Sequence, residues 1–302
     1  MITTFEQLLQ EAGKKDGIVV GVPAPEDSSS IETVIQAKKD KIADFILCGD
    51  KGKIISLLEE HGGNPDDFEI LDGESFEDSA TKIVELANRN KVHVILKGFL
   101  PTASLMKPIL DKEKGLRTGN LLSDVMMVEN PLDNFKGLLG VTDGGLNILP
   151  DLKQKEQIIE NAVKVYHKLG VDCPKVGVLA ASEKVKDAMP ATVDAQALTE
   201  MNKNGEISGC EVYGPLALDI AVSPEAAEHK GVNHPVAGYA QILVVPSIEV
   251  GNVFGKSFTY YHKLPVCHVV MGARIPILIP SRNDTEVDKI HSVALGVICA
   301  EC

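Results

Sequence analysis

Short apolar runs rich in β-branched residues alternate with longer amphipathic stretches in the N-terminal third of the chain. The pattern predicts strands at 17–22, 45–48, 69–71 and 92–96, with helices at 30–40, 53–61 and 77–89. Strands that alternate with helices in this way form parallel sheets whose faces the helices cover. The N-terminal third therefore predicts an α/β fold.

The alternation becomes irregular after residues 115–120 and returns near Val270. Between these points we predict strands at 122–128, 138–142, 176–180 and 242–246, a helix at 151–169, and a glycine-interrupted loop and helix at 250–264. The first two of these strands are spaced as an antiparallel ribbon, and a helix at 285–300 closes the chain.

This change of pattern predicts two α/β domains. Residues 1–117 and 270–302 would form a discontinuous first domain, with residues 118–269 inserted as the second. The cleft between two such domains is a common place for a ligand.

Composition narrows the classes of partner. Acidic residues outnumber basic ones by 43 to 30, and the chain has 8 Phe, 5 Tyr and no Trp. Nucleic-acid binding relies on cations and, for single strands, on aromatic rings, so we expect no nucleic-acid partner. No apolar run is long enough to cross a membrane, and residues 1–17 lack the features of a signal peptide. Six scattered cysteines suit reduced, buried thiols, so we expect a cytoplasmic protein without membrane contacts.

The polar segment Ser281–Asp288 lies between a strand predicted at 277–279 and the last helix. α/β proteins bind anions at such places because backbone amides and the helix dipole point at the ligand. Ser281 offers a hydroxyl donor, Arg282 a fixed cation and Asp288 a base. The pattern Thr285-x-x-Asp288 also fits a helix capping box, so both interpretations stay open.

Two further strand ends carry candidate ligand contacts. Lys97 and Gly98 follow the strand at 92–96, and Thr102 and Lys107 come shortly after them. These residues suit contacts with phosphate or carboxylate, although a solvated surface charge is the alternative for Lys107. Asp143 ends the strand at 138–142, where it either lines the cleft or caps a turn.

The segment 251–257 resembles a phosphate-binding loop but has one residue too few between its glycines. Glycine still lets a ligand approach the backbone, so Gly251, Asn252 and Lys256 are candidate substrate contacts. A simple helix entry is the alternative. The histidines show no spacing typical of metal ligands. Cys299 and Cys302 have the C-x-x-C spacing, but zinc would need a second cysteine pair, so we expect no metal site.

Six segments in this order resemble the phosphate acetyl/butyryl transferase family, and the resemblance covers nearly the whole chain. They are residues 95–110, 116–125, 141–151, 214–231, 244–258 and 279–290. The resemblance implies two α/β domains with the active site in the cleft, as in isocitrate and isopropylmalate dehydrogenases. It also implies acyl exchange between coenzyme A and inorganic phosphate, without a metal, a cofactor or a covalent intermediate.

The resemblance also implies roles for single residues. Asp288 would take the thiol proton of coenzyme A, while Ser281 and Arg282 would stabilise the oxyanion and the phosphate. Thr102 matches the family's threonine after Lys-Gly. Lys107 stands where acetyltransferases tend to carry arginine, and lysine keeps the charge but loses the bidentate fork.

Residues 115–119 and the compact length resemble the butyryl branch, so we expect butyryl to be preferred, with acetyl as the alternative. The expected partners are acyl-CoA, inorganic phosphate, acyl phosphate and a second copy of the chain in a homodimer. Two other classes stay open. A metal-dependent hydroxy-acid dehydrogenase would need clustered aspartates and a nicotinamide site, and a non-catalytic solute-binding protein would need an export signal.

Overall fold

The computed structural model describes residues 1–281 and 283–301. They fall into two compact units. Unit 1 comprises Met1–Phe5 and Leu121–Val266, and unit 2 comprises Glu6–Asn120 and Cys267–Cys302. The first residues join unit 1 because Ile2 N donates to Leu169 O at 2.8 Å. Unit 2 is therefore discontinuous in sequence.

Unit 2 is built on a mostly parallel sheet with the order β3-β2-β1-β4-β11-β10. Its strands are β1 (Val19–Pro23), β2 (Asp44–Gly49), β3 (Glu69–Asp72), β4 (Val94–Leu96), β10 (Val266–Met271) and β11 (Ile277–Leu278). Its helices are α1 (Phe5–Ala12), α2 (Ser28–Lys39), α3 (Lys51–Glu60), η1 (Pro65–Asp67), α4 (Phe76–Asn88), α5 (Thr102–Ile109) and α11 (Glu286–Cys299). Only the pairing of β10 with β11 is antiparallel among those described in this sheet.

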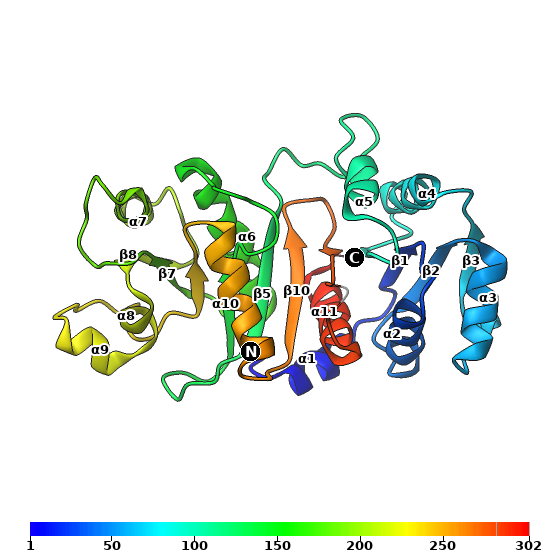
Figure 1. Cartoon of the computed structure of the whole chain (residues 1–302), viewed down its shortest axis with the longest axis horizontal. Coiled ribbons are helices and arrows are strands. Elements are labelled where there is room, and N and C mark those ends of the chain that lie inside the picture. Colours follow the sequence, from blue (N-terminus) through cyan, green and yellow to red (C-terminus); the bar gives the residue numbers. More distant parts are fainter. Residues whose placement is uncertain (282, 302) are drawn as a thin grey trace. The chain divides into compact units, whose positions relative to one another are not determined.

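The helices of unit 2 lie on both faces of its sheet. Figure 1 shows α2, α3 and α11 on one face and α4 and α5 on the other, and α11 packs directly against α2. Side chains fix where these helices begin: Asp27 caps α2 and Ser75 caps α4. The predicted β-then-helix order with helices on both faces is confirmed.

Unit 1 has the strand order β5-β6-β9-β7-β8. Its strands are β5 (Ser123–Glu129), β6 (Leu138–Thr142), β7 (Lys175–Leu179), β8 (Glu211–Leu216) and β9 (Ile242–Val244). Its helices are α6 (Leu152–Lys168), α7 (Pro190–Lys203), α8 (Leu218–Val222), α9 (Pro224–His229) and α10 (Ile248–Tyr260). The predicted antiparallel ribbon is confirmed as the β5–β6 pair, and the other described pairings are parallel.

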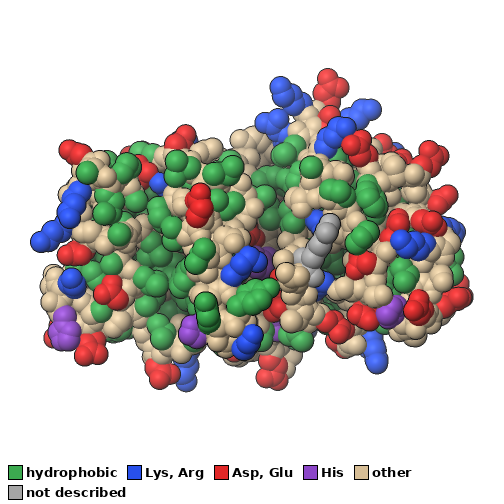
Figure 2. Space-filling view, viewed as in Figure 1, with side chains coloured by type: hydrophobic (Ala, Val, Ile, Leu, Met, Phe, Trp, Pro, Cys, Tyr) green, Lys and Arg blue, Asp and Glu red, His purple; other side chains and the backbone are tan. Residues whose placement is uncertain are grey.

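The structure corrects one prediction in unit 1 and adds two elements. The segment α10 is one continuous helix instead of a loop and a helix, and the strand β8 and the helix α9 were not predicted. Hydrophobic side chains are exposed on α10 among charged ones (Figure 2). Val253 is 72% exposed there and Tyr261, at the end of the helix, 86%.

Two expectations from composition concern the whole chain. Within the described residues, none of the helices combines the length and the apolar character that a membrane crossing requires. Cys48, Cys210, Cys267 and Cys299 are buried free thiols, whereas Cys173 is exposed, which corrects the prediction that the thiols are buried.

Candidate active site

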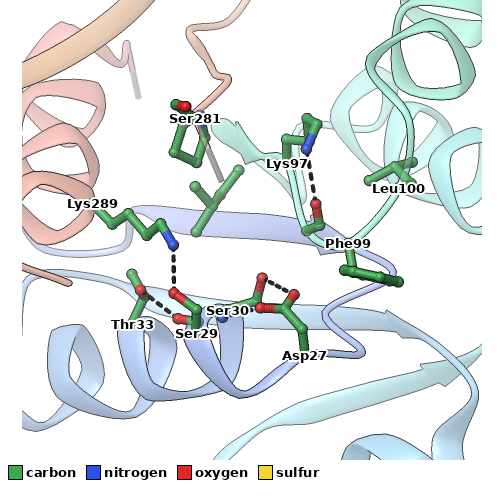
Figure 3. A pocket seen from close by; sticks show the side chains of 12 residues that line it. Asp27, Ser29, Ser30, Thr33, Lys97, Phe99, Leu100, Ser281 and Lys289 are labelled. Carbon is green, nitrogen blue, oxygen red and sulfur yellow. Dashed lines mark hydrogen bonds between the residues drawn. The ribbon is translucent and has the colours of Figure 1, made fainter. Parts of the chain in front are cut away.

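A pocket of about 210 Å³ lies in unit 2, where β4 and β11 end and α2 begins (Figure 3). It is lined by Asp27, Ser29, Ser30, Thr33, Leu96, Lys97, Gly98, Phe99, Leu100, Pro280, Ser281 and Lys289. The two strands are parallel neighbours, so the residues that follow them meet at one edge of the sheet. The pocket thus brings together three of the predicted site residues, Lys97, Gly98 and Ser281.

Gly98 has a packing role that explains why no larger residue fits. A Cβ atom at this position would lie 2.4 Å from Ala24 O and 2.5 Å from Pro23 O. Phe99 N donates to the same Ala24 O at 2.7 Å, which holds the loop after β4 against the end of β1. The half-buried Lys97 donates from Nζ to Gly98 O at 3.2 Å. This close backbone approach shapes one wall of the pocket.

Ser281 lines the pocket shortly after β11. Its backbone N donates to Asp284 Oδ2 at 2.7 Å, and Asp284 N donates back to Ser281 O at 3.2 Å. Burial raises the pKa of the Asp284 carboxyl, with a smaller contribution in the same direction from Asp288. The predicted Arg282 lies outside the described residues. Asp284 was missed in the sequence, where it reads as a turn residue.

Asp288 is buried in the first turn of α11. Its Oδ2 accepts from Thr285 Oγ1 at 2.7 Å and from Thr285 N at 3.0 Å, while Asp288 N donates to Thr285 Oγ1 at 3.2 Å. The predicted capping box is therefore confirmed. The role of Asp288 as a base stays a prediction.

The remaining polar wall comes from α2 and α11. Lys289 extends from α11 and donates from Nζ to Ser29 Oγ of α2 (Figure 3). Asp27 accepts from Ser30 N at 3.0 Å and from Ser30 Oγ at 2.6 Å. Sequence reasoning missed this wall because a lysine in a helix and a serine-rich helix start are both ordinary features of a solvated surface.

Two other predicted residues lie in unit 2 without lining the pocket. Thr102 is the first residue of α5 and its side chain is exposed. Lys107 lies in the last turn of the same helix and pairs with Glu77 at 3.1 Å. Their contribution to substrate binding stays a prediction.

The remaining predicted residues lie in unit 1, and two of them, Asp143 and Gly251, contact the turn after β6. Buried Asp143 accepts from Gly145 N at 2.7 Å and from Leu146 N at 3.0 Å, so it caps this turn. Burial is the main cause that raises the pKa of Asp143, and nearby Asp124 adds to it. A Cβ at Gly251 would lie 2.7 Å from Gly144 Cα, so α10 packs tightly on the turn.

Asn252 and Lys256 lie further along α10. Asn252 Nδ2 donates to Gly144 O at 3.4 Å, and the Lys256 side chain is exposed. The segment 251–257 is wholly helical, so it forms no phosphate-binding loop. Among residues 1–281 and 283–301, no three His, Cys, Asp or Glu side chains are grouped to hold a metal ion.

Comparison with known proteins gives these features a context. Residues 74–297 match the family described as phosphate acetyl/butaryl transferase. The chain is 40% identical to a phosphate butyryltransferase from Clostridium acetobutylicum, over 99% of each protein. It is 36% identical to a phosphate acetyltransferase from Thermotoga maritima, over 98% of this chain and 100% of the relative.

Solved structures agree with this assignment. A branched-chain phosphotransacylase from Enterococcus faecalis V583 superposes with a TM-score of 0.82 at 30% identity, over 94% of this chain and 100% of that one. A 4-hydroxythreonine-4-phosphate dehydrogenase from Klebsiella pneumoniae, 12% identical with a TM-score of 0.54 over 93% of this chain and 99% of that one, shares the fold alone. The predicted dehydrogenase-like α/β fold class is confirmed.

The fold and the sequence matches together define an acyl-transferring enzyme. The chain belongs to the phosphate acetyl/butyryl transferase family.

Proposed function

We propose that this chain transfers short acyl groups reversibly between coenzyme A and inorganic phosphate, and that it prefers the butyryl group. The full-length similarity to a phosphate butyryltransferase is the observation that carries the proposal. The similarity to a branched-chain phosphotransacylase also favours an acyl group longer than acetyl. Phosphate acetyltransferase activity is the second candidate, because relatives with that name match over a similar length.

The proposed reaction is a direct transfer. A thiol with a pKa of about 8.5 is only partly ionised at neutral pH, so a base that takes its proton speeds the attack. The sulfur of coenzyme A attacks the carbonyl carbon of the acyl phosphate, the carbon–sulfur bond forms, and the bond from carbon to the phosphate oxygen breaks. Phosphate leaves, and the reverse reaction retraces these steps.

Residues of unit 2 fit the charges that develop in this reaction. We assign the base to Asp288, which its capping box holds in one orientation. Ser281 lies on the pocket wall, where its hydroxyl can donate to phosphate or to the oxyanion. Lys97 supplies positive charge to the same pocket. Donors that are placed before the reaction stabilise developing charge without reorganisation.

The same proposal includes the cofactor requirement, the cellular compartment and the oligomeric state. Coenzyme A acts as a substrate, and the transfer uses neither a metal nor a resident cofactor. We place the enzyme in the cytoplasm, since buried free thiols are typical of a reducing compartment. We expect it to act as a homodimer.

Release of coenzyme A from acetyl-, butyryl- and isobutyryl-CoA, with and without phosphate, tests the proposal. We expect release that depends on phosphate, with kcat/KM at least about tenfold higher for butyryl-CoA than for acetyl-CoA, since one methylene is worth about 1–3 kcal/mol. EDTA should leave the rate unchanged.

Each part of the proposal can fail separately in this assay. Equal or better kcat/KM with acetyl-CoA would refute the preference for butyryl. Loss of activity in EDTA would contradict the reaction without metal, and no release from any of the three thioesters would refute the activity itself.

A further inference from the structure

Lys289 is a buried cation that faces the pocket. The residue is 8% exposed, and its side chain extends from α11 to α2, where Nζ donates to Ser29 Oγ (Figure 3). In the described part of the chain, no carboxylate lies within ion-pair distance of this ammonium group, although the Asp284 carboxylate attracts it at longer range. A neutral hydroxyl is therefore its only direct polar partner there.

Lys155 is another buried lysine of this chain and provides a comparison. It is 5% exposed in α6 of unit 1, and its Nζ lies 2.6 Å from Asp194 Oδ2. Burying a charge is costly unless an opposite charge compensates it. Lys155 has a carboxylate in direct contact, whereas the described residues give Lys289 only the more distant charge of Asp284, and Lys289 opens onto a pocket that has room for a separate anion.

The other walls also suit an anion. Lys97 brings a second ammonium group to the pocket, and Ser281 contributes a hydroxyl on the wall beside Lys289. Asp27, the one carboxylate among the described residues of the walls, is turned to α2, where its two oxygens accept from Ser30 Oγ and Ser30 N. The described lining residues therefore carry two cations and one carboxylate around an open space.

The size of the pocket limits the anion. Its volume of about 210 Å³ is below the roughly 300–1,000 Å³ of sites that enclose whole drug-sized molecules. Inorganic phosphate, or the phosphate end of a short acyl phosphate, fits this description better than an entire coenzyme.

We propose that Lys289 binds the phosphoryl group of the transfer reaction in this pocket: inorganic phosphate in one direction and the phosphate end of the acyl phosphate in the other. The inference rests on the proposed function and adds to it a residue and a location for one substrate. The ammonium group of Lys289 holds the phosphate oxygens beside Ser281.

Lys289→Met tests the proposal, because methionine keeps much of the side-chain length and removes the charge. We expect KM for phosphate to rise about 10- to 100-fold, the range for losing a hydrogen bond to a charged group. KM for butyryl-CoA should stay close to its wild-type value. Lys289→Arg keeps the charge and should recover part of the loss.

Binding can also be measured without turnover. In the absence of any acyl-CoA, phosphate should raise the melting temperature of the wild-type protein, and Lys289→Met should lose this shift. Lys155→Met is the matched control, since it also removes a buried lysine. It should lower the melting temperature but keep both the phosphate-induced shift and KM for phosphate.

Ser29→Ala provides a second variant if Lys289→Met does not fold. It removes the hydroxyl that positions the lysine, and we expect a rise of about three- to tenfold in KM for phosphate. Unchanged KM for phosphate and an unchanged shift in both Lys289→Met and Ser29→Ala would overturn the proposal.

Two further outcomes distinguish a failure of the phosphate assignment from a failure of the proposed acyl transfer. A rise in KM for butyryl-CoA or coenzyme A, with KM for phosphate unchanged, would show that the pocket takes a phosphate of the coenzyme and would also overturn the proposal. A wild-type enzyme without phosphate-dependent release would refute the proposed function, while the phosphate-induced melting shift would still test the pocket.

Discussion

The carboxylate of Asp288 accepts two hydrogen bonds from Thr285 in the first turn of α11. An amide at this position cannot take a proton from a thiol. We therefore expect Asp288→Asn to lower kcat about 10²- to 10⁴-fold and to lower the free energy of unfolding by about 0.5–2 kcal/mol. Steady-state kinetics and urea unfolding measure the two effects.

Thr285→Ala is the matched control for Asp288, because it breaks the same capping box from the other side. It should lose similar stability but lower kcat far less than Asp288→Asn does, because the carboxylate that takes the proton is still present. If both variants lose stability and both keep kcat, Asp288 only caps the helix and the base lies elsewhere.

Asp284 gives a prediction about pH. Burial raises its pKa in the folded protein above the ordinary value of about 3.9 that it has when unfolded. The folded state therefore holds the proton more tightly, and stability falls as the pH rises from the unfolded pKa through the folded one. Asparagine does not ionise, so Asp284→Asn should be more stable than the wild type at pH 7.

Urea unfolding at a series of pH values measures this difference in stability. The difference should shrink as the pH falls and disappear below about pH 3.9, where the carboxyl is protonated in both states. A difference that does not change with pH, or a variant less stable at pH 7, would contradict the assignment of a raised pKa to Asp284.

At the scale of single residues, the sequence predicted part of the pocket lining. Lys97, Gly98 and Ser281 were predicted because each follows a recognisable strand, and residues that follow neighbouring parallel strands meet at one edge. Lys289 could not be predicted as a pocket residue. Only the packing of α11 against α2 turns its side chain inward, and that contact joins residues from opposite ends of the sequence.

Two glycines of α10 differ in what surrounds them. A Cβ at Gly251 would meet backbone atoms, Gly144 Cα at 2.7 Å and Asp143 O at 2.8 Å, whereas a Cβ at Gly255 would meet the flexible end of Met126, its Sδ at 2.8 Å. A methionine side chain can shift, but the backbone of a turn held by several hydrogen bonds cannot shift at low cost.

We therefore expect Gly251→Ala to lower the free energy of unfolding by about 1–3 kcal/mol, as overpacking does. Gly255→Ala should be nearly neutral, because the gain in helix propensity of about 1 kcal/mol offsets the movement of Met126. Chemical denaturation of the two variants measures both values. Equal losses would show that the contact with the turn is not what limits position 251.

The same glycines explain an error in the prediction of elements. Glycine usually interrupts a helix, so 250–264 was interpreted as a loop and a helix, yet here the glycines allow α10 to pack closely on its neighbours. The strand β8 escaped prediction because Gly214 and Pro215 interrupt its apolar run. Its pairing with β7 supplies an extended conformation that its own sequence does not favour.

For the whole molecule, the apolar face of α10 supports the expectation of a homodimer. Val250, Val253, Tyr260 and Tyr261 are 44%, 72%, 53% and 86% exposed and lie along one side of the helix. Apolar side chains grouped in this way on a surface are typical of an interface. We expect a second copy of the chain to cover this face.

Val253→Glu tests this expectation, because a buried charge without a partner opposes association. Sedimentation velocity should show a dimer for the wild type and a smaller species for the variant. Val193→Glu changes another exposed valine of unit 1, on α7, and should leave the dimer intact. A monomeric wild type, or a dimer unaffected by Val253→Glu, would refute an interface at α10.

Unit 2 is made of two segments of the chain, and residues 121–266 of unit 1 lie between them in the sequence. This order has a consequence for synthesis on the ribosome. Lys97 emerges before residues 121–266, which form nearly all of unit 1, and Ser281 and Lys289 emerge only after them. Because domains generally fold as units, the nascent chain can complete most of unit 1 while the sheet of unit 2 still lacks β11 beside β4. The pocket beside Lys289 is then among the last parts of the enzyme to form, and a ribosome that stalls before residue 281 releases no chain able to build it.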